Sequence, residues 1–146
     1  MSIQHNDMQS GIKPVRVAGP IAVGTTGTGQ TGKVIDRQGF GGVEFIASYG
    51  AITSVTAVFT LTVMEGDVTG TMTSVADADL IGTEALAGVA AANPRVSGTS
   101  ANVSNKIGYK GSKRYVSVHV KSTATAGTPV AVTAILFNPQ NPGLLA

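Results

Sequence analysis

The chain has 146 residues, ten of them basic and eight acidic, and its formal net charge at pH 7 is +2. It contains no cysteine, which excludes a disulfide framework and thiolate chemistry and suits a protein made in a reducing cytoplasm. No apolar run approaches the roughly 18 residues of a membrane span. The N-terminal residues also lack the pattern of a secretion signal, so we expect no membrane contact.

The composition favours β-structure. Only 12% of the residues are charged and 5% are aromatic, whereas Val, Thr, Ala, Gly and Ser dominate, which is unfavourable for long amphipathic helices. The charges are divided unevenly, because residues 1–84 hold all eight acids and four bases, and residues 85–146 hold six bases and no acid. A chain polarised in this way suits contacts between copies or docking on an acidic surface.

The first 32 residues are expected to form an extended arm. Pro14, Pro20 and the glycine- and threonine-rich residues 24–32 offer many chain breaks and few side chains to pack. Residues 27–33 match the G-x-x-x-x-G-K pattern of a phosphate-binding loop, but Val34 stands where Ser or Thr is needed, and a strand pattern follows where a helix must begin. We interpret this segment as a linker, followed by one β-sandwich domain over residues 33–146.

Strand patterns are dense from residue 33 onward. We predict strands over residues 33–37, 43–52, 54–64 and 71–75, with a turn at residues 65–67. Residues 76–92 are rich in alanine but interrupted by Gly82 and Gly88, so one or two short helical turns are expected there. Roughly seven or eight short strands without long helices predict an all-β fold, an antiparallel β-sandwich resembling a jelly roll.

Residues 102–121 predict a β-hairpin with two different faces. Gly111 and Ser112 fit the two-residue loop of a type II′ turn, which places Gly108 opposite Tyr115. One face forms a core surface and carries Val103, Ile107, Tyr109, Val116, Val118 and Val120. The other face is basic and carries Lys106, Lys110, Lys113, Tyr115, His119 and Lys121. Such a face fits docking on an acidic partner, although lysines can equally serve only to keep a β surface soluble.

Residues 129–137 predict a last strand that is apolar on both faces. Such a strand either lies centrally in a two-layer core or faces another subunit. The mean hydropathy of +0.23 is high for a monomer, which favours subunit contacts. We expect self-association into a dimer or trimer, with Val130, Ile135 and Phe137 as the candidate residues.

No residue pattern indicates catalysis. No metal-ligand spacing recurs around His5 or His119, the two histidines of the chain. Asp77 and Asp79 lack the oxygen spacing of a calcium loop, and no serine lies in a G-x-S-x-G motif. Ten basic residues are sparse for nucleic-acid binding, and no recognition motif is present. We expect a non-enzymatic protein with no cofactor, no metal ion and no nucleic-acid partner.

Two segments carry a family resemblance. Residues 34–52 open with Asp36-Arg37 and contain a phenylalanine-rich strand, and residues 106–120 contain Gly108-Tyr109, Gly111 and the run Lys113-Arg114-Tyr115-Val116. With the apolar strand 129–137, this pattern resembles small virion proteins of tailed bacteriophages that are encoded close to the major capsid gene. The resemblance covers residues 33–138. The best-understood of these proteins are head decoration (cement) proteins, which are jelly-roll domains that bind outside the capsid lattice.

The resemblance implies a virion structural protein on the capsid exterior, made in the cytoplasm of a bacterial host. Its partners would be the major capsid protein, whose neighbouring capsomers it ties together, and other copies of itself. Two alternatives stay open, a tail or head–tail joining protein and a virion surface carbohydrate-binding module. Carbohydrate-binding modules usually present exposed aromatic platforms, whereas this chain has no tryptophan and three tyrosines.

Overall fold

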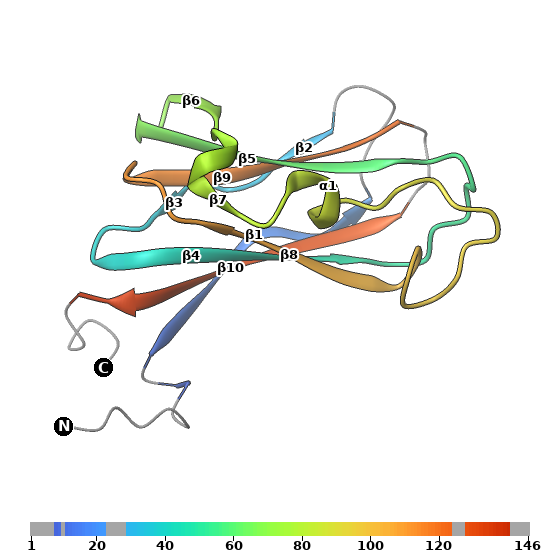
Figure 1. The fold of residues 1–146 in the computed structure, drawn as a ribbon, viewed down its shortest axis with the longest axis horizontal. Helices are drawn as coiled ribbons and strands as arrows, with labels where there is room; N and C mark the ends of the chain where they lie inside the picture. The colour runs from blue at the N-terminus through green and yellow to red at the C-terminus, as the bar shows by residue number, and fades with distance from the viewer. Residues whose placement is uncertain (1–7, 10, 23–28, 124–127, 141–146) are drawn as a thin grey trace.

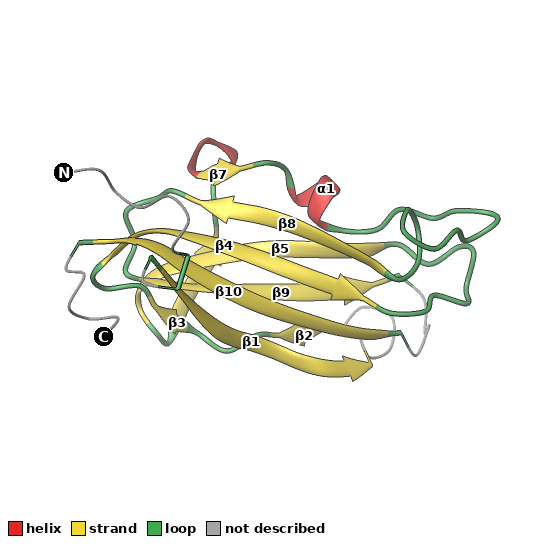
Figure 2. Ribbon diagram, turned by 90° about the horizontal axis from the view of Figure 1, so that it is seen from below, coloured by secondary structure: helices red, strands yellow, loops and turns green. Residues whose placement is uncertain are grey.

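The computed structural model describes residues 8–9, 11–22, 29–123 and 128–140. Their strands form two sheets packed face to face (Figure 1 and Figure 2). Sheet A has the order β1-β10-β4-β8-β7, and its strands are β1 (Ile12–Ala22), β10 (Pro129–Pro139), β4 (Phe40–Tyr49), β8 (Val103–Tyr109) and β7 (Leu80–Ile81). Sheet B has the order β2-β9-β5-β6, with β3 also pairing with β9, and its strands are β2 (Gln30–Thr31), β9 (Tyr115–Ser122), β5 (Phe59–Val68), β6 (Thr71–Ser74) and β3 (Ile35–Asp36).

Successive parts of the chain alternate between the two sheets. The path runs from β1 in sheet A to β2 and β3 in sheet B, then to β4 in A, β5 and β6 in B, β7 and β8 in A, β9 in B and β10 in A. All strand pairings are antiparallel. The predicted all-β antiparallel sandwich is confirmed, and this alternation is the arrangement of a jelly roll.

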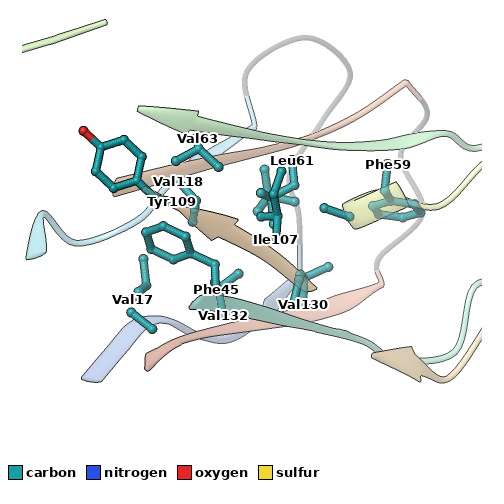
Figure 3. Packing of buried hydrophobic residues seen from close by; sticks show 14 of the residues in the cluster. Val17, Phe45, Phe59, Leu61, Val63, Ile107, Tyr109, Val118, Val130 and Val132 are labelled. Carbon is teal, nitrogen blue, oxygen red and sulfur yellow. The ribbon is translucent and has the colours of Figure 1, made fainter. Parts of the chain in front are cut away.

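The inward-facing side chains of both sheets meet in one core (Figure 3). Val43, Phe45 and Ala47 alternate along β4, and Phe59, Leu61 and Val63 alternate along β5, and all six are buried. The rings of Tyr49 and Phe59 pack edge to face, with centroids 5.7 Å apart. The period of two in the sequence therefore identified the buried face of these strands correctly.

Two short helical segments follow β6, as predicted for residues 76–92. They are the 3-10 helix η1 (Asp77–Asp79) and α1 (Glu84–Ala87), and Figure 1 shows α1 between β5 and β8. The Thr83 hydroxyl caps α1 by accepting the Leu86 N–H at 3.2 Å. The Glu84 carboxylate accepts the Val63 N–H at 2.9 Å, so α1 is tied to the edge of β5.

Strand β1 corrects the prediction of an arm over residues 1–32. Residues 12–22 pair with β10 and form an edge of sheet A, and Val17 is buried in the core. The two prolines indicated a chain break, but Pro14 and Pro20 are both compatible with an edge strand, where one side of the backbone has no strand partner. Residues 1–7 and 23–28, which include part of the proposed linker, lie outside the described residues.

The hairpin prediction for residues 102–121 is wrong. β8 pairs with β4 and β7 in sheet A, whereas β9 pairs with β5, β2 and β3 in sheet B, so residues 110–114 form an arch between the sheets. Gly111 also lacks the positive φ that a type II′ turn requires at its position. A Cβ at Gly111 would stand 2.5 Å from the hydroxyl oxygen of Tyr109. Glycine is therefore needed for close packing on a tyrosine and not for turn geometry.

We expect Val17→Ala to lower the free energy of unfolding by about 2 kcal/mol, because two buried methyl groups are lost and a cavity remains. Urea unfolding followed by circular dichroism measures the change. Pro14→Ala, at an exposed position of the same strand, is the matched control and should change stability by less than about 1 kcal/mol. Equal stability of Val17→Ala and wild type would show that β1 is not part of the cooperative unit.

Candidate docking surfaces

Tyr109 crosses the space between the sheets where the chain passes from β8 to β9. It extends from sheet A, and its hydroxyl donates to Glu65 Oε2 of sheet B at 2.5 Å and accepts the Lys113 N–H at 3.0 Å. Burial, and next the hydrogen bond to Glu65, raise the pKa of Tyr109 above its usual value. The hydroxyl therefore stays protonated and holds the arch against sheet B.

Arg37 fixes the other side of the arch. Its guanidinium donates to the carbonyl oxygens of Lys113 and Gly111, both at 2.5 Å, and to that of Phe40 at 3.4 Å. Its central carbon also lies 5.2 Å from the centroid of the Tyr109 ring, within cation–π range. Because the arch carbonyls use its donors, Arg37 acts as a structural cross-link and not as a free surface cation.

Two ion pairs neutralise charges beside the arch. Arg114 binds Asp36 through two hydrogen bonds of 3.0 and 2.7 Å, which are the main cause of the lowered pKa of Asp36. Lys113 donates to Asp67 at 2.5 Å. Of the basic candidates in the arch, only Lys110 has no ion pair with a described residue.

The six predicted docking residues do not share one face. Tyr115, His119 and Lys121 lie on the outer side of β9 in sheet B, since Val116, Val118 and Val120 face the core. Lys106 lies on the outer side of sheet A, and Lys110 and Lys113 lie in the arch. The separation follows from the arch, because each of the two sheets turns its outer face away from the other.

Three of the predicted docking residues lie on the outer face of sheet B, among side chains that carry hydroxyl groups. We define this docking face as the outward residues Thr31, Thr60, Thr62, Tyr115, His119 and Lys121. Thr31 Oγ1 lies 3.0 Å from His119 Nδ1, so β2 is joined to β9 by a side-chain contact as well as by the backbone. The Arg114 guanidinium lies 5.1 Å from the Tyr115 ring centroid. The ring is thus held in place and half-exposed.

The self-association candidates are also divided. Val130 is 2% exposed and belongs to the core, so it is not a contact residue for another subunit. Ile135 and Phe137 lie on the outer face of sheet A and are half-buried. The Phe137 ring packs over Gly42 of the neighbouring strand, where a side chain would collide with it. β10 lies inside sheet A, between β1 and β4. This is the first of the two positions predicted for it, a strand within the two-layer core.

Arg37, Tyr109 and Glu65 are the residues whose role the sequence patterns missed. Tyr109 was assigned to the core, but its contacts to Arg37 and Glu65 join segments far apart in the chain. Asp36-Arg37 and Gly108-Tyr109 both belong to the quoted family pattern, which was the one available signal. Within the described ranges, no group of three or more His, Asp or Glu side chains could hold a metal ion, and no helix is long and apolar enough to cross a membrane.

No protein-family model and no curated protein match the sequence. Among solved structures, the capsid of Ralstonia phage GP4 is similar at 16% identity and a TM-score of 0.47, over 89% of this chain and 84% of that chain. The CBM22-1–GH10 modules of Clostridium thermocellum endo-1,4-beta-D-xylanase 10B, complexed with xylohexaose, are similar at 15% identity and a TM-score of 0.42, over 90% of this chain and 27% of that one. Eiger TNF from S. frugiperda is similar at 12% identity and a TM-score of 0.37, over 90% of this chain and 88% of that one. Similarities this weak transfer no function to the chain.

Replacing Tyr109 with phenylalanine should lower the free energy of unfolding by about 1–3 kcal/mol, because the Glu65 carboxylate and the Lys113 N–H both lose a partner. Chemical unfolding measures the loss. Tyr115→Phe is the control, because the Tyr115 hydroxyl forms no hydrogen bond with a described residue and its ring is half-exposed. A Tyr109→Phe variant as stable as Tyr115→Phe would contradict the structural role of the hydroxyl.

The Asp36–Arg114 pair predicts a small stability loss in acid. The folded-state pKa of Asp36 is lowered, so the pair stabilises the fold above the unfolded pKa of about 3.9 and loses this contribution as the pH falls through the folded value. The effect is small because the two side chains are 47% and 42% exposed. Measured by urea unfolding between about pH 5 and pH 2, the free energy of unfolding should fall more steeply for wild type than for Asp36→Asn. If the free energy of unfolding had the same pH dependence in both proteins, the contribution of the Asp36–Arg114 pair would be contradicted.

Proposed function

We propose that this chain is a non-enzymatic virion structural protein, a decoration (cement) protein that binds the outside of a phage head lattice and ties neighbouring capsomers together. The observation that carries the proposal is that the two segments with the family resemblance meet in space. Asp36 binds Arg114, and Arg37 binds the carbonyls of Gly111 and Lys113. The two segments of the pattern therefore contribute to one structural unit, the arch between β8 and β9.

The docking face of sheet B is the surface we assign to the major capsid protein. Lys121 is exposed on it, and among its own described residues no carboxylate balances this charge. The nearby Asp36 and Asp67 are already paired with Arg114 and Lys113. An acidic capsid surface would therefore meet a net basic face carrying hydroxyl groups and one half-exposed tyrosine, which suits a polar interface of many weak contacts.

Charge reversal of two lysines on opposite faces tests the docking face. An exposed ion pair contributes only about 0–1 kcal/mol, so Lys121→Glu should lower the occupancy of undecorated heads at subsaturating protein, and added salt should lower wild-type occupancy in the same way. Lys106→Glu on sheet A is the matched control and should bind heads like wild type. Heads are pelleted and the bound protein is quantified. If Lys106→Glu lost binding and Lys121→Glu did not, the docking surface would lie on sheet A and not on sheet B.

Copy number per virion tests the role itself. A cement protein repeats over the whole lattice, so mass spectrometry of purified particles should find hundreds of copies. A tail or head–tail joining protein would give a few copies to dozens, and that result would overturn the decoration role while leaving a virion structural role intact. Absence of the chain from purified particles would overturn both.

A further inference from the structure

Strand β8 has strand partners on both sides only at its C-terminal end. β7 pairs with the last two residues of β8 and ends at Ile81, where Gly82, with a φ of +94°, turns the chain away. Figure 2 shows β7 beside one end of β8 only. The rest of β8 is therefore an open edge of sheet A, and Ser104 and Lys106 are exposed on it.

The unpaired backbone groups of this edge belong to Ser104 and Lys106. Successive residues of a strand direct their N–H and C=O groups to opposite neighbours. The Lys110 N–H points to the β7 side, where it donates to the Asp79 carbonyl at 2.9 Å. The alternation therefore directs the groups of Lys106 and Ser104 to this side, where neither has a backbone hydrogen bond with any described part of the chain.

The pairing of β8 with β4 indicates the same direction. The Gly50 N–H, directly after β4, donates to the Pro129 carbonyl on the β10 side at 2.9 Å. Ala47, three residues earlier, therefore directs its groups to β8, and its partner Asn105 turns toward β4. Asn102 precedes β8 and has a φ of +48°, so its N–H, which donates to Gly50, does not follow this alternation.

A groove of about 580 Å³ lies along the open edge. Ser104 and Lys106 line it on the side of the strand, and Ile81 and Leu86, which are 51% and 72% exposed, line it as well. Asn105 Nδ2 donates to the carbonyl at the end of α1 at 2.6 Å, so the helix is held beside the edge without pairing with it. Free backbone groups next to apolar side chains suit an extended segment that carries apolar residues.

We propose that an extended segment of the major capsid protein adds to sheet A beside β8, in line with β7, and pairs with the backbone of Ser104 and Lys106. This inference rests on the proposed function, because a protein that ties neighbouring capsomers together needs a second attachment besides the docking face of sheet B. Alternating N–H and C=O groups at strand spacing are complementary to another polypeptide backbone. The groove contains one acid and one base, Glu44 and Lys106, so the backbone and not charge selects the segment.

A second copy of this chain is a poor occupant of this edge. β1, the edge strand on the other side of sheet A, contains Pro14 and Pro20 and has register shifts along its pairing with β10. The outer strands of sheet B, β2, β3 and β6, are only two to four residues long. Continuation of a sheet from copy to copy is therefore disfavoured, and a segment from the capsid is the better match.

Residue-resolved amide hydrogen exchange tests the pairing in the full chain. In the isolated protein, the amides of Ser104 and Lys106 should exchange fast, whereas those of Asn105 and Ile107, which pair with β4, should exchange slowly. On saturated heads, exchange at Ser104 and Lys106 should slow by about tenfold or more, with no change at the other two amides. This alternating pattern distinguishes strand addition from general shielding of the surface.

A proline substitution tests the contribution of one backbone N–H. Lys106→Pro removes a donor that points away from β4, so the fold is retained, and head occupancy at subsaturating protein should fall by about two- to tenfold. Lys106→Glu keeps the N–H and is the matched control, with wild-type occupancy expected. Circular dichroism establishes that each variant is folded, and Ser104→Pro takes the place of Lys106→Pro if that variant does not fold.

The possible failures have different meanings. Saturated heads on which Ser104 and Lys106 exchange as fast as in the isolated protein would overturn the inference and leave the decoration role intact. Slow exchange of both amides in the isolated protein would also overturn it, because the edge would already be paired, by a second copy if sedimentation velocity finds an oligomer. Failure of wild type to bind undecorated heads would overturn the proposed function, and this inference with it. Lys121→Glu should lower occupancy without changing the exchange pattern of the copies that remain bound.

Discussion

The contact of Tyr109 with Glu65 and Arg37 is the interaction on which the arrangement of the other surfaces depends. Tyr109 belongs to β8 of sheet A, and its hydroxyl binds the Glu65 carboxylate of sheet B and the Lys113 N–H. The residues that follow Tyr109 therefore pass around this hydroxyl. Arg37 then holds the carbonyls of that passage. The chain therefore enters the opposite sheet at β9 instead of folding back on β8, and the outward residues of the two strands face away from each other.

The same arrangement separates the surfaces by chemistry. The outer face of sheet B carries hydroxyl groups, a histidine and an unpaired lysine, and the charges beside it are neutralised in pairs. The β1 edge of sheet A carries Lys13 and Arg16, which form no ion pair with a described residue. Edge strands invite uncontrolled pairing, but β1 contains Pro14 and Pro20 and has register shifts along its pairing with β10. Open-ended extension of the sheet along this edge is therefore disfavoured.

Much of the site could not be predicted from the sequence, for identifiable reasons. The Gly111-Ser112 pair has the composition of a tight turn, but close packing of Tyr109 on Gly111 produces the same composition. Lys113 and Arg114 looked like docking cations, yet their acidic partners Asp67 and Asp36 come from strands distant in the chain. Local patterns do not contain this information, because an ion pair depends on which strands become neighbours.

The sequence by itself determined the all-β class, the approximate positions of most strands and the side of β4, β5, β8 and β9 that faces the core, since alternation with a period of two fixes which side chains point inward. Only the tertiary structure decided which strands pair. The pairing of β8 with β4, and of β9 with β5, depends on the contacts of Tyr109 and on the closing of two sheets over one core. It also decided that β1 belongs to the sandwich, because the burial of Val17 comes from packing that the residues around it do not reveal.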